Sequence, residues 1–597
     1  MTTKICIFVK VIGVRSPKEY TWEWNTSTSE SLNLYKFVRL NLIHKKRIHQ
    51  KDTMHLWHKD EKILNGESPC SSYERNSKDI IELHLIVVTR LEVSITLKIK
   101  FQNKELKDKI PFNVKDTIET LLKYFGLLPE KVVKLMEGDE EVTHEELIVD
   151  TPFYKGLIIE YDDEPPRKCK IIMMQDTIGR PSDYGKDPKE TKTRKEKLQK
   201  EGTPICDHRD DVIGDDITLY YPGFQKFIED SNDASIVLER EDYEFAKRMC
   251  TEMSKYFNTE EPRHNEFFKI LSLKFKTLKG ELVHENKGYK VDISIGTECY
   301  ILIEVKNESG DSYAQVIGYY VQSLKGKYPD QCPAPAYLLE LVGPQLSISG
   351  AVFGKYVFVD RLVDSVWLVP HQNEEATIRV ARILKALKDA IREIQAYYKN
   401  NTRIDNPEFP VFQSCDKGSI QYKERMKRHI FKGTLTYNNG EEVDVIIKFT
   451  KRYCREAHAL MYKEGCAPQL IHYEERVGGT QYTAVVIEYI DGIMHLDEYL
   501  KEYPDNKSEP EPFQDALKVL HDHGFCHGKL TSNNIFMEFK DGKDYINIVN
   551  YEWAGRIGEA RYPFSADIPD GIEPGDLISK TWDRAQLDKF FDSTDSR

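Results

Sequence analysis

Apolar and polar residues alternate in several short stretches near the N-terminus, which is typical of strands buried on one face. Residues 4–9 (KICIFV) and 20–24 (YTWEW) predict a hairpin. Ser27 and Glu30 then have the spacing of a capping box ahead of a helix that carries Leu34. The stretches MHLWHKD and IIELHLIVV predict further strands. The order strand, strand, helix, strands is that of a ubiquitin-like β-grasp domain.

The same order recurs in the next part of the chain. ITLKIKF and DKIPFNV predict a second hairpin, and Asp116 and Glu119 begin a second helix. KGLIIEY predicts a closing strand. The apolar face of this helix has helical spacing and comprises Ile118, Leu121, Leu122 and Phe125. We therefore expect two small β-grasp modules in tandem.

Changes in this pattern divide the 597 residues into several parts. The fold class that they predict is multidomain α+β and α/β. Beyond the second module the apolar pattern stops. It returns in a stretch that predicts both helices and strands and that ends in a long helix. A polar linker then precedes a last part in which helices and strands are again predicted. The expected parts are 1–90 and 91–162 (β-grasp modules), 163–204 (charged linker), 205–398 and 405–597.

The linker carries a run of basic residues. Lys186–Lys200 holds seven basic residues against three acidic ones. Charge runs of this kind are usually solvated faces or linkers. The alternative is a segment that contacts phosphate or directs nuclear import.

Composition narrows the function classes. With 40% hydrophobic and 31% charged residues, the sequence is typical of globular domains, and no run approaches the roughly 18 apolar residues of a membrane span. The net charge of −13 argues against a protein that coats nucleic acid with its whole surface, so DNA binding requires a local basic face. The 11 cysteines are scattered without a CxxC pair or histidines at zinc spacing, which predicts free thiols and no structural zinc.

One predicted hairpin carries charged residues that suit a metal site. In Tyr289–Glu308 (YKVDISIGTECYILIEVKNE), two β-rich runs flank a Gly-Thr turn. Glu304 and Lys306 project to one face, and Asp292 can present its carboxylate to the same face. Carboxylates hold Mg²⁺, and a nearby Lys orients the attacking water in phosphodiester hydrolysis. The spacing D-x11-E-x-K is the core of the PD-(D/E)xK nuclease motif, so these three residues are the predicted catalytic residues, with Asp292 and Glu304 as metal ligands.

Two flanking helices add candidate residues. HNEFFKIL predicts an amphipathic helix with Glu266, a further candidate metal ligand. YAQVIGYYVQSL predicts a helix with Gln315 and Tyr319 one turn apart. This Q-x3-Y pairing is a companion motif of several nuclease branches and makes Gln315 a candidate catalytic residue. The alternative is an ordinary half-exposed hairpin, because outward Glu and Lys with inward Ile and Val describe any such sheet.

Elements of the C-terminal part occur in the order found in protein kinases. VDVIIKF places Lys448 on a strand, and REAHAL places Glu456 on a helix where it would pair with that Lys. AVVIEYIDG is typical of the hinge, and FCHGKLTSNNIF aligns with H-R-D-x-x-x-x-N through His527 and Asn534. INIVNYEWAG aligns with the strand before D-F-G and supplies Asn550. These five residues are predicted to bind nucleotide, with ATP as the candidate ligand.

The chemistry of this kinase outline is altered. Lys529 takes the position of the Asp that accepts the proton of the substrate hydroxyl. Asn550 takes the position of the metal-holding Asp, and a neutral amide is a weaker Mg²⁺ ligand. The sequence therefore predicts a pseudokinase. An active atypical kinase, in which Asn550 or Glu552 holds the metal, ranks last.

In the order of its parts the chain resembles the Crinkler family of effectors. The resemblance extends over nearly the whole chain, although its N-terminal segment departs from the family's L-F-L-A-K pattern. It is carried by the segments CIFVKVIG, LNLYKFVRLNL with a later LW, IEVKNE, LLELVGPQLSISGAVF, HGKLTSNNIF, NYEWAG and EARYPF.

This resemblance implies specific modules and a place of action. It implies a ubiquitin-like N-terminal domain at 1–90, a PD-(D/E)xK nuclease-like domain with a restriction-endonuclease-like core at 205–398, and a protein-kinase-like domain at 405–597. It also implies a secreted effector that acts in the nucleus of a host cell, where DNA cleavage causes cell death or altered defence. The implied partner is DNA, and no membrane is expected as a partner. Host proteins and a second copy of the chain, as a homodimer, are further candidates. The export route stays open, because no signal peptide is visible.

A second hypothesis assigns the chain no enzymatic activity. In it the chain is an effector scaffold that binds host proteins through the β-grasp pair and the pseudokinase, and the nuclease site is a relic. Its support is the loss of both kinase carboxylates, at Lys529 and Asn550. Biological activity of a variant changed at both Asp292 and Glu304 discriminates the two hypotheses.

Overall fold

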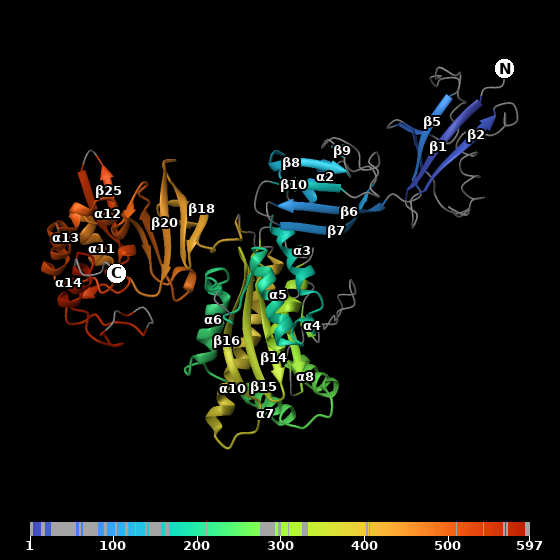
Figure 1. Cartoon of the computed structure of the whole chain (residues 1–597). Coiled ribbons are helices and arrows are strands. Elements are labelled where there is room, and N and C mark those ends of the chain that lie inside the picture. The colour runs from blue at the N-terminus through green and yellow to red at the C-terminus, as the bar shows by residue number, and fades with distance from the viewer. Residues whose placement is uncertain are drawn as a thin grey trace. The chain divides into compact units, whose positions relative to one another are not determined.

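The computed structural model of the chain is mixed α+β with several sheets (Figure 1). It divides into two compact units, Met1–Asp176 and Thr177–Arg597. The five parts predicted from the sequence are finer than this division and stay predictions. The structure describes residues 4–12, 18–25, 55–58, 61–63, 81–88, 92–101, 104–113, 118–125, 127–137, 140–141, 157–161, 166–209, 212–274, 293–295, 300–307, 310–324, 332–400, 404, 406–508, 510–540, 543–564, 568 and 571–591.

The first sheet lies at the N-terminus and has the order β2-β1-β5-β3-β4. The predicted hairpin is formed by β1 and β2, and β1 also pairs with β5 in parallel. The predicted helix around Leu34 lies outside the described residues. The strands are β1 (Lys4–Ile12), β2 (Lys18–Asn25), β3 (His55–His58), β4 (Glu61–Ile63) and β5 (Ile81–Val88).

The second sheet repeats this arrangement in the order β7-β6-β10-β8-β9. Its first two strands form the predicted hairpin, and β10 pairs with β6 in parallel. The predicted helix is α2 (Ile118–Phe125), in which Leu122 and Phe125 are buried. The strands are β6 (Glu92–Phe101), β7 (Lys104–Asn113), β8 (Val132–Glu137), β9 (Glu140–Glu141) and β10 (Leu157–Tyr161).

The expected charged linker, 163–204, is helical. Asp187 caps the helix that contains most of the basic run, and its side chain accepts a hydrogen bond from the Lys189 amide at 2.9 Å. Opposite charges one turn apart favour a helix over an extended linker, and the buried Leu198 gives this one an apolar contact. The helices are α3 (Arg167–Ile178), α4 (Pro181–Tyr184) and α5 (Pro188–Lys200).

A six-stranded sheet in the order β11-β16-β15-β14-β13-β12 forms the centre of the second unit. The hairpin predicted within Tyr289–Glu308 forms one edge of this sheet, with β12 antiparallel to β13. Next to it β14 runs parallel to β13, and β14, β15 and β16 are antiparallel. The strands are β11 (Ile205–Cys206), β12 (Ile293–Ile295), β13 (Ile301–Lys306), β14 (Ala336–Val342), β15 (Gln345–Phe353) and β16 (Val357–Trp367).

Helices cover this sheet. One face packs Ile303 and Val305 into a large hydrophobic core with side chains of α6, α7, α8 and α10. Helix α9, which connects β13 to β14, packs on both of these strands and is itself covered by α4. The helices are α6 (Gly223–Asn232), α7 (Arg240–Met253), α8 (Glu260–Lys274), α9 (Ser312–Ser323) and α10 (Glu374–Lys399).

The C-terminal part begins with another six-stranded sheet, in the order β17-β18-β19-β20-β22-β21. Its apolar residues continue the core of the central sheet, whereas the following helices enclose a core of their own. The strands of this sheet are β17 (Ser414–Cys415), β18 (Gly418–Lys427), β19 (Ile430–Tyr437), β20 (Glu442–Thr450), β21 (Leu470–Glu474) and β22 (Thr483–Glu488).

Short strands and helices complete this part. The strands are β23 (Met494–His495), β24 (Phe525–Cys526), β25 (Ile535–Lys540), β26 (Lys543–Ile548) and β27 (Gly555–Arg556). The helices are α11 (Arg455–Lys463), α12 (Leu496–Glu502), α13 (Glu511–Asp522) and α14 (Lys580–Asp588).

Polar contacts also join the C-terminal six-stranded sheet to the segment before α6. Arg425 on β18 binds Asp215 through two nitrogens, with Nε 2.9 Å from Oδ2 and Nη2 3.2 Å from Oδ1. Asp215 is buried and also accepts hydrogen bonds from the Tyr220 hydroxyl and the His429 amide. This ion pair therefore fixes β18 to the segment before α6. Among the described helices, none is long and apolar enough to cross a membrane.

Candidate functional site

Glu304 and Lys306 lie side by side on the central sheet, as the strand alternation predicted. The Lys306 Nζ atom is 2.9 Å from Glu304 Oε1. Because β13 has a partner strand on each side, Glu304 is 2% exposed, whereas Lys306 at the strand end is half-buried. A buried carboxylate needs a cation or hydrogen-bond donors, and Lys306 supplies the cation. Asp292, the third predicted catalytic residue, lies outside the described residues.

A second carboxylate lies on the same face of the sheet, next to Glu304. Glu304 and Glu340 are direct partners in the parallel register of β13 and β14. Glu340 accepts a hydrogen bond from Ser312 Oγ at 2.7 Å and pairs with Arg361 Nη1 at 2.5 Å. The two carboxylates thus have separate cations, Lys306 and Arg361. Our sequence reasoning missed Glu340, although a charged residue inside the apolar run AYLLELV is a local signal of such a site.

Arg263 and Asn307 fix the end of the hairpin to α8. Arg263 is buried and donates from Nε to Asn307 Oδ1 at 2.9 Å. It also donates from Nη1 to the carbonyl oxygens of Met253 and Gly343, at 2.9 and 2.8 Å. Asn307 Nδ2 donates to the carbonyl oxygen of Phe257 at 2.6 Å. These hydrogen bonds hold the strand directly after the predicted catalytic Lys.

The acidic residue of α8 that reaches the hairpin is Glu260. Its Oε2 atom is 3.4 Å from Lys306 Nζ. Glu260 begins the helix, where a carboxylate is favoured by the partial positive charge of the N-terminus. Glu266, the residue predicted as a metal ligand, instead pairs with Lys269 at 2.9 Å on its own helix. The structure therefore brings Glu260 to the predicted catalytic Lys, and the role of Glu266 stays a prediction.

Gln315 lies on α9, and its side chain contacts α4. Its Nε2 atom donates to the carbonyl oxygen of Ser182 at 3.3 Å. The contact is close, because a Cβ atom at Gly185 would lie 2.5 Å from Gln315 Cγ. Gln315 is buried, and its Oε1 makes no hydrogen bond within the described part of the chain. The amide that we predicted to be catalytic therefore helps to hold α4 on α9.

In the C-terminal part, Lys448 is held by two residues that follow β26. Its Nζ atom is 2.5 Å from Asn550 Oδ1 and 2.9 Å from Glu552 Oε1. Burial lowers the pKa of Lys448, and the Glu552 carboxylate offsets part of this effect. The structure thus brings the predicted Lys448 and Asn550 into direct contact.

The structure corrects the predicted ion pair between Lys448 and Glu456. The buried face of α11 comprises Ala457, His458 and Met461, which leaves Glu456 exposed. The carboxylate that neutralises Lys448 comes from Glu552 instead. The pairing was mispredicted because the spacing of a Glu along a helix does not fix which face of that helix packs on the sheet.

The residues aligned with the kinase catalytic loop form a hydrogen-bonded group. Asn534 Nδ2 donates to the Lys529 carbonyl oxygen at 2.9 Å, and Asn550 Nδ2 donates to Asn534 Oδ1 at 3.2 Å. His527 Nε2 lies 3.0 Å from the Val549 carbonyl oxygen and acts as the donor. Burial lowers the pKa of His527, which favours this neutral form. Asn550 has φ of 71°, in the left-handed region that Asn tolerates better than most residues.

Asp583 is a positioning residue that our sequence reasoning missed. Its Oδ2 accepts a hydrogen bond from the His527 amide at 2.7 Å, and its Oδ1 accepts one from the Gly528 amide at 2.8 Å. His521 Nε2 is 3.0 Å from the same carboxylate. Asp583 is fully buried on α14. It orients the backbone of the loop, and no motif in the sequence marks it.

Lys529 occupies the position where a kinase has its catalytic carboxylate. Its Nζ atom lies 4.4 Å from the centroid of the Trp553 ring, a cation–π geometry. A cation here cannot accept the proton of a substrate hydroxyl.

Comparisons with known proteins find no matching family and a distantly similar solved structure. No protein-family model matches the sequence, and no curated protein matches it. The structure is similar to that of the Cydia pomonella granulovirus kinase PK-1, at 15% sequence identity and a TM-score of 0.23. The match covers 28% of this chain and 65% of the viral kinase.

Proposed function

We propose that the chain is a Mg²⁺-dependent DNA endonuclease with Asp292, Glu304 and Lys306 as its catalytic residues. The observation that carries this proposal is the 2.9 Å pair between Glu304 and Lys306 on the buried strand of a hairpin. The strand order supports it, because α9 follows the hairpin and β14 returns parallel to β13. A hairpin of this kind presents an E-x-K pair on one face of a sheet.

The donor set fits a hard divalent cation. Glu304 and Asp292 would hold Mg²⁺ through carboxylate oxygens, and bound Mg²⁺ would lower the pKa of a coordinated water. Lys306 neutralises Glu304 and would donate a hydrogen bond to the attacking water or to a phosphate oxygen. Glu260 beside Lys306 holds the ammonium in position. In this scheme Lys306 stabilises the negative charge that develops on the scissile phosphate.

Cleavage of supercoiled plasmid tests the proposal. The full chain is incubated with Mg²⁺ or EDTA beside Glu304→Gln, an isosteric variant that removes one charge. Asp389→Asn is the matched control, because Asp389 is an exposed carboxylate of α10 that pairs with Arg392. We expect Mg²⁺-dependent nicking by the wild type and the control, and none by Glu304→Gln. Equal cleavage by all three proteins would contradict the proposal.

The C-terminal part has a second candidate function, nucleotide binding without phosphotransfer. The contact of Lys448 with Asn550 and the cation at Lys529 favour it, whereas Glu552 must release Lys448 before a phosphate can bind there. Incubation with labelled ATP and Mg²⁺ tests it, and no phosphate transfer is expected. Substantial transfer that is lost in Lys448→Ala would establish an active kinase instead.

The resemblance to Crinkler effectors supports a place of action in the nucleus of a host cell. The tagged chain is expressed in eukaryotic cells, and nuclear DNA breaks are compared between wild type and Glu304→Gln. Nuclear signal with breaks that depend on Glu304 would support the nuclease effector. Full biological activity of a variant changed at both Asp292 and Glu304 would favour the scaffold hypothesis.

A further inference from the structure

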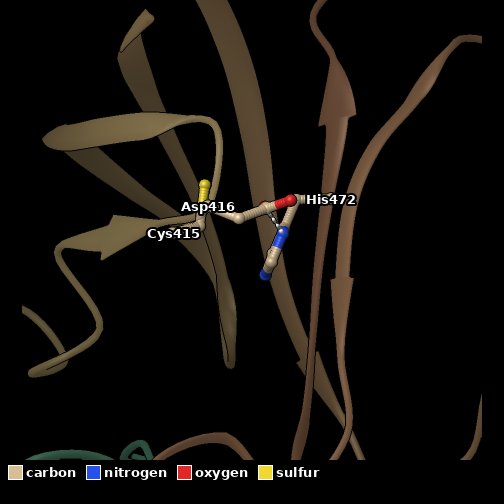
Figure 2. A group of neighbouring side chains, drawn as sticks. All are labelled: Cys415, Asp416 and His472. Carbon is tan, nitrogen blue, oxygen red and sulfur yellow. Dashed lines mark hydrogen bonds and ion pairs between the residues drawn. The ribbon is translucent and has the colours of Figure 1, made fainter. Parts of the chain in front are cut away.

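Cys415, Asp416 and His472 lie close together, although they come from opposite edges of the C-terminal six-stranded sheet (Figure 2). Cys415 ends β17, and Asp416 follows in the turn to β18, whereas His472 lies on β21. In the strand order of this sheet β17 is first and β21 is last, so the two strands are not hydrogen-bonded neighbours. The curved sheet therefore brings its opposite edges together at these three side chains.

The three side chains direct ligand atoms at one small region. Asp416 Oδ1 is 2.6 Å from His472 Nδ1, and the thiol, carboxylate and imidazole atoms all lie within 4.8 Å of one another. The His472 side chain is 10% exposed and stacks on the Phe412 ring, with centroids 5.9 Å apart and planes at 23°. Cys415 is a free thiol. The ring is thus held in one orientation beside the two shorter side chains.

We propose that Cys415, Asp416 and His472 bind one Zn²⁺ ion. Zinc takes thiolate sulfur, imidazole nitrogen and carboxylate oxygen at about 2.0–2.3 Å, so that ligand atoms around one ion lie about 3–4 Å apart. The observed spacing needs only small side-chain rotations to reach this geometry. A thiolate and an imidazole favour Zn²⁺ over Mg²⁺, which prefers oxygen ligands. Three protein ligands leave a fourth position for water.

Glu474 supplies the outer contact that such a site requires. It lies two residues beyond His472 on β21, and its Oε2 is 3.5 Å from His472 Nε2. That nitrogen is buried and makes no hydrogen bond within the described part of the chain. A histidine that binds zinc through one nitrogen usually donates its other N–H to a carboxylate. With Nδ1 on the metal, Nε2–H points to Glu474.

Zinc at this place would join two strands that the backbone does not join. Ser414 and Glu474, which flank the cluster, also line a cavity of about 180 Å³ between the C-terminal six-stranded sheet and the segment that holds Leu219 and Pro222. A bound ion would hold the β17–β18 turn against β21 and close this edge. The competing explanation is an ordinary ion pair between Asp416 and His472, which leaves Cys415 without a role.

Cobalt binding tests the site, because a Co²⁺–thiolate bond gives a charge-transfer band in the near ultraviolet. Untagged full chain, stripped with EDTA and kept reduced, is titrated with Co²⁺ and then with Zn²⁺. We expect the band at one equivalent, its loss on Zn²⁺ addition, and its absence in Cys415→Ser. Cys466→Ser is the matched control, since Cys466 is another half-buried thiol of this part, and it should keep the band.

A second variant separates the metal site from a folding defect. Glu474→Gln keeps all three ligands and should weaken Zn²⁺ binding by about 10- to 100-fold. Zn²⁺ should also raise the melting temperature of the wild type more than that of Cys415→Ser. A wild type without the band, or a Cys415→Ser variant that retains it, would overturn the proposal and leave only the ion pair. Neither result depends on nuclease activity.

Discussion

Lys448 and Glu552 form a partly buried ion pair, with Nζ 2.9 Å from Oε1. In protein kinases the corresponding Lys pairs with a Glu of the following helix and contacts nucleotide phosphates. Here the helix residue, Glu456, is exposed, and the carboxylate comes from the segment after β26. If the C-terminal part binds nucleotide as proposed, Glu552 would compete directly with a nucleotide phosphate for the Lys448 ammonium.

Replacing Glu552 should strengthen nucleotide binding. In Glu552→Gln the Lys448 ammonium keeps its contact with Asn550 but loses its anionic partner, so a phosphate can take that place. We expect several-fold tighter binding of a fluorescent ATP analogue, measured by titration with and without Mg²⁺. Glu456→Gln is the control and should bind like the wild type. Weaker binding in Glu456→Gln, with no change in Glu552→Gln, would mean that the kinase pairing forms in solution.

The acidic residues of α8 should differ in their effect on DNA cleavage. Glu260 contacts Lys306, whereas Glu266 pairs with Lys269. Glu260→Gln is therefore expected to lower the rate of plasmid cleavage several-fold, because it loosens the ammonium beside the scissile phosphate. Glu266→Gln should cleave at close to the wild-type rate. The reverse order of the two rates would restore Glu266 as the metal ligand predicted from the sequence.

The stability of the C-terminal part should fall as the pH falls from about 6.5 to about 4. Burial lowers the pKa of His458 to about 4, against about 6.5 in the unfolded chain. In this window the unfolded state binds a proton that the folded state does not, so the free energy of unfolding decreases with decreasing pH. The full effect of this one histidine is about 3 kcal/mol.

The contacts of His458 are those of a neutral imidazole, in which one ring nitrogen donates and the other accepts. Nε2 donates to the Pro468 carbonyl oxygen at 2.9 Å, and Nδ1 accepts from the Tyr453 hydroxyl at 2.7 Å. Melting temperatures at pH 7 and pH 5 check the prediction, and the difference between them should shrink in His458→Gln. A pH dependence as large in the variant as in the wild type would show that His458 is not its source.

Breaking the Asp215–Arg425 pair should destabilise the second unit strongly. Asp215→Asn leaves the Arg425 guanidinium without its anion at a mostly buried site, a loss of about 3–5 kcal/mol for pairs of this kind. The exposed pair of Lys423 and Asp444 is the comparison, and Lys423→Gln should cost less than about 1 kcal/mol. Urea unfolding measures both values. Equal effects of the two substitutions would indicate that the Asp215 pair is solvated.

Local patterns predicted much of the secondary structure. The hairpin of β12 and β13, the amphipathic α2 and the helix α9 with Gln315 and Tyr319 are all present. The expected linker is helical instead, because a composition rich in charge describes both a solvated coil and a helix with charge pairs one turn apart. Asp292 lies outside the described residues, so the complete nuclease triad stays a prediction.

Side-chain partners were predicted less well than elements. Glu304 and Lys306 share one strand, and the alternation of side chains placed them together. Gln315 was predicted as a candidate catalytic residue; its amide contacts α4, and its catalytic role stays a prediction. The spacing along a helix gives the neighbours on that helix, whereas the element packed on it depends on the whole fold.

The sequence by itself determined what acts over a few residues: strand alternation, helix periodicity, capping, and the E-x-K and H-x6-N spacings. Only the tertiary structure decided which distant residues meet. It made Glu552, in place of Glu456, the partner of Lys448, it placed Asp583 against the loop of His527, and it brought Cys415 close to His472. The physical reason is that periodicity is a property of neighbouring backbone dihedral angles, whereas ion pairs and metal ligands form through space after sheets curve and helices pack.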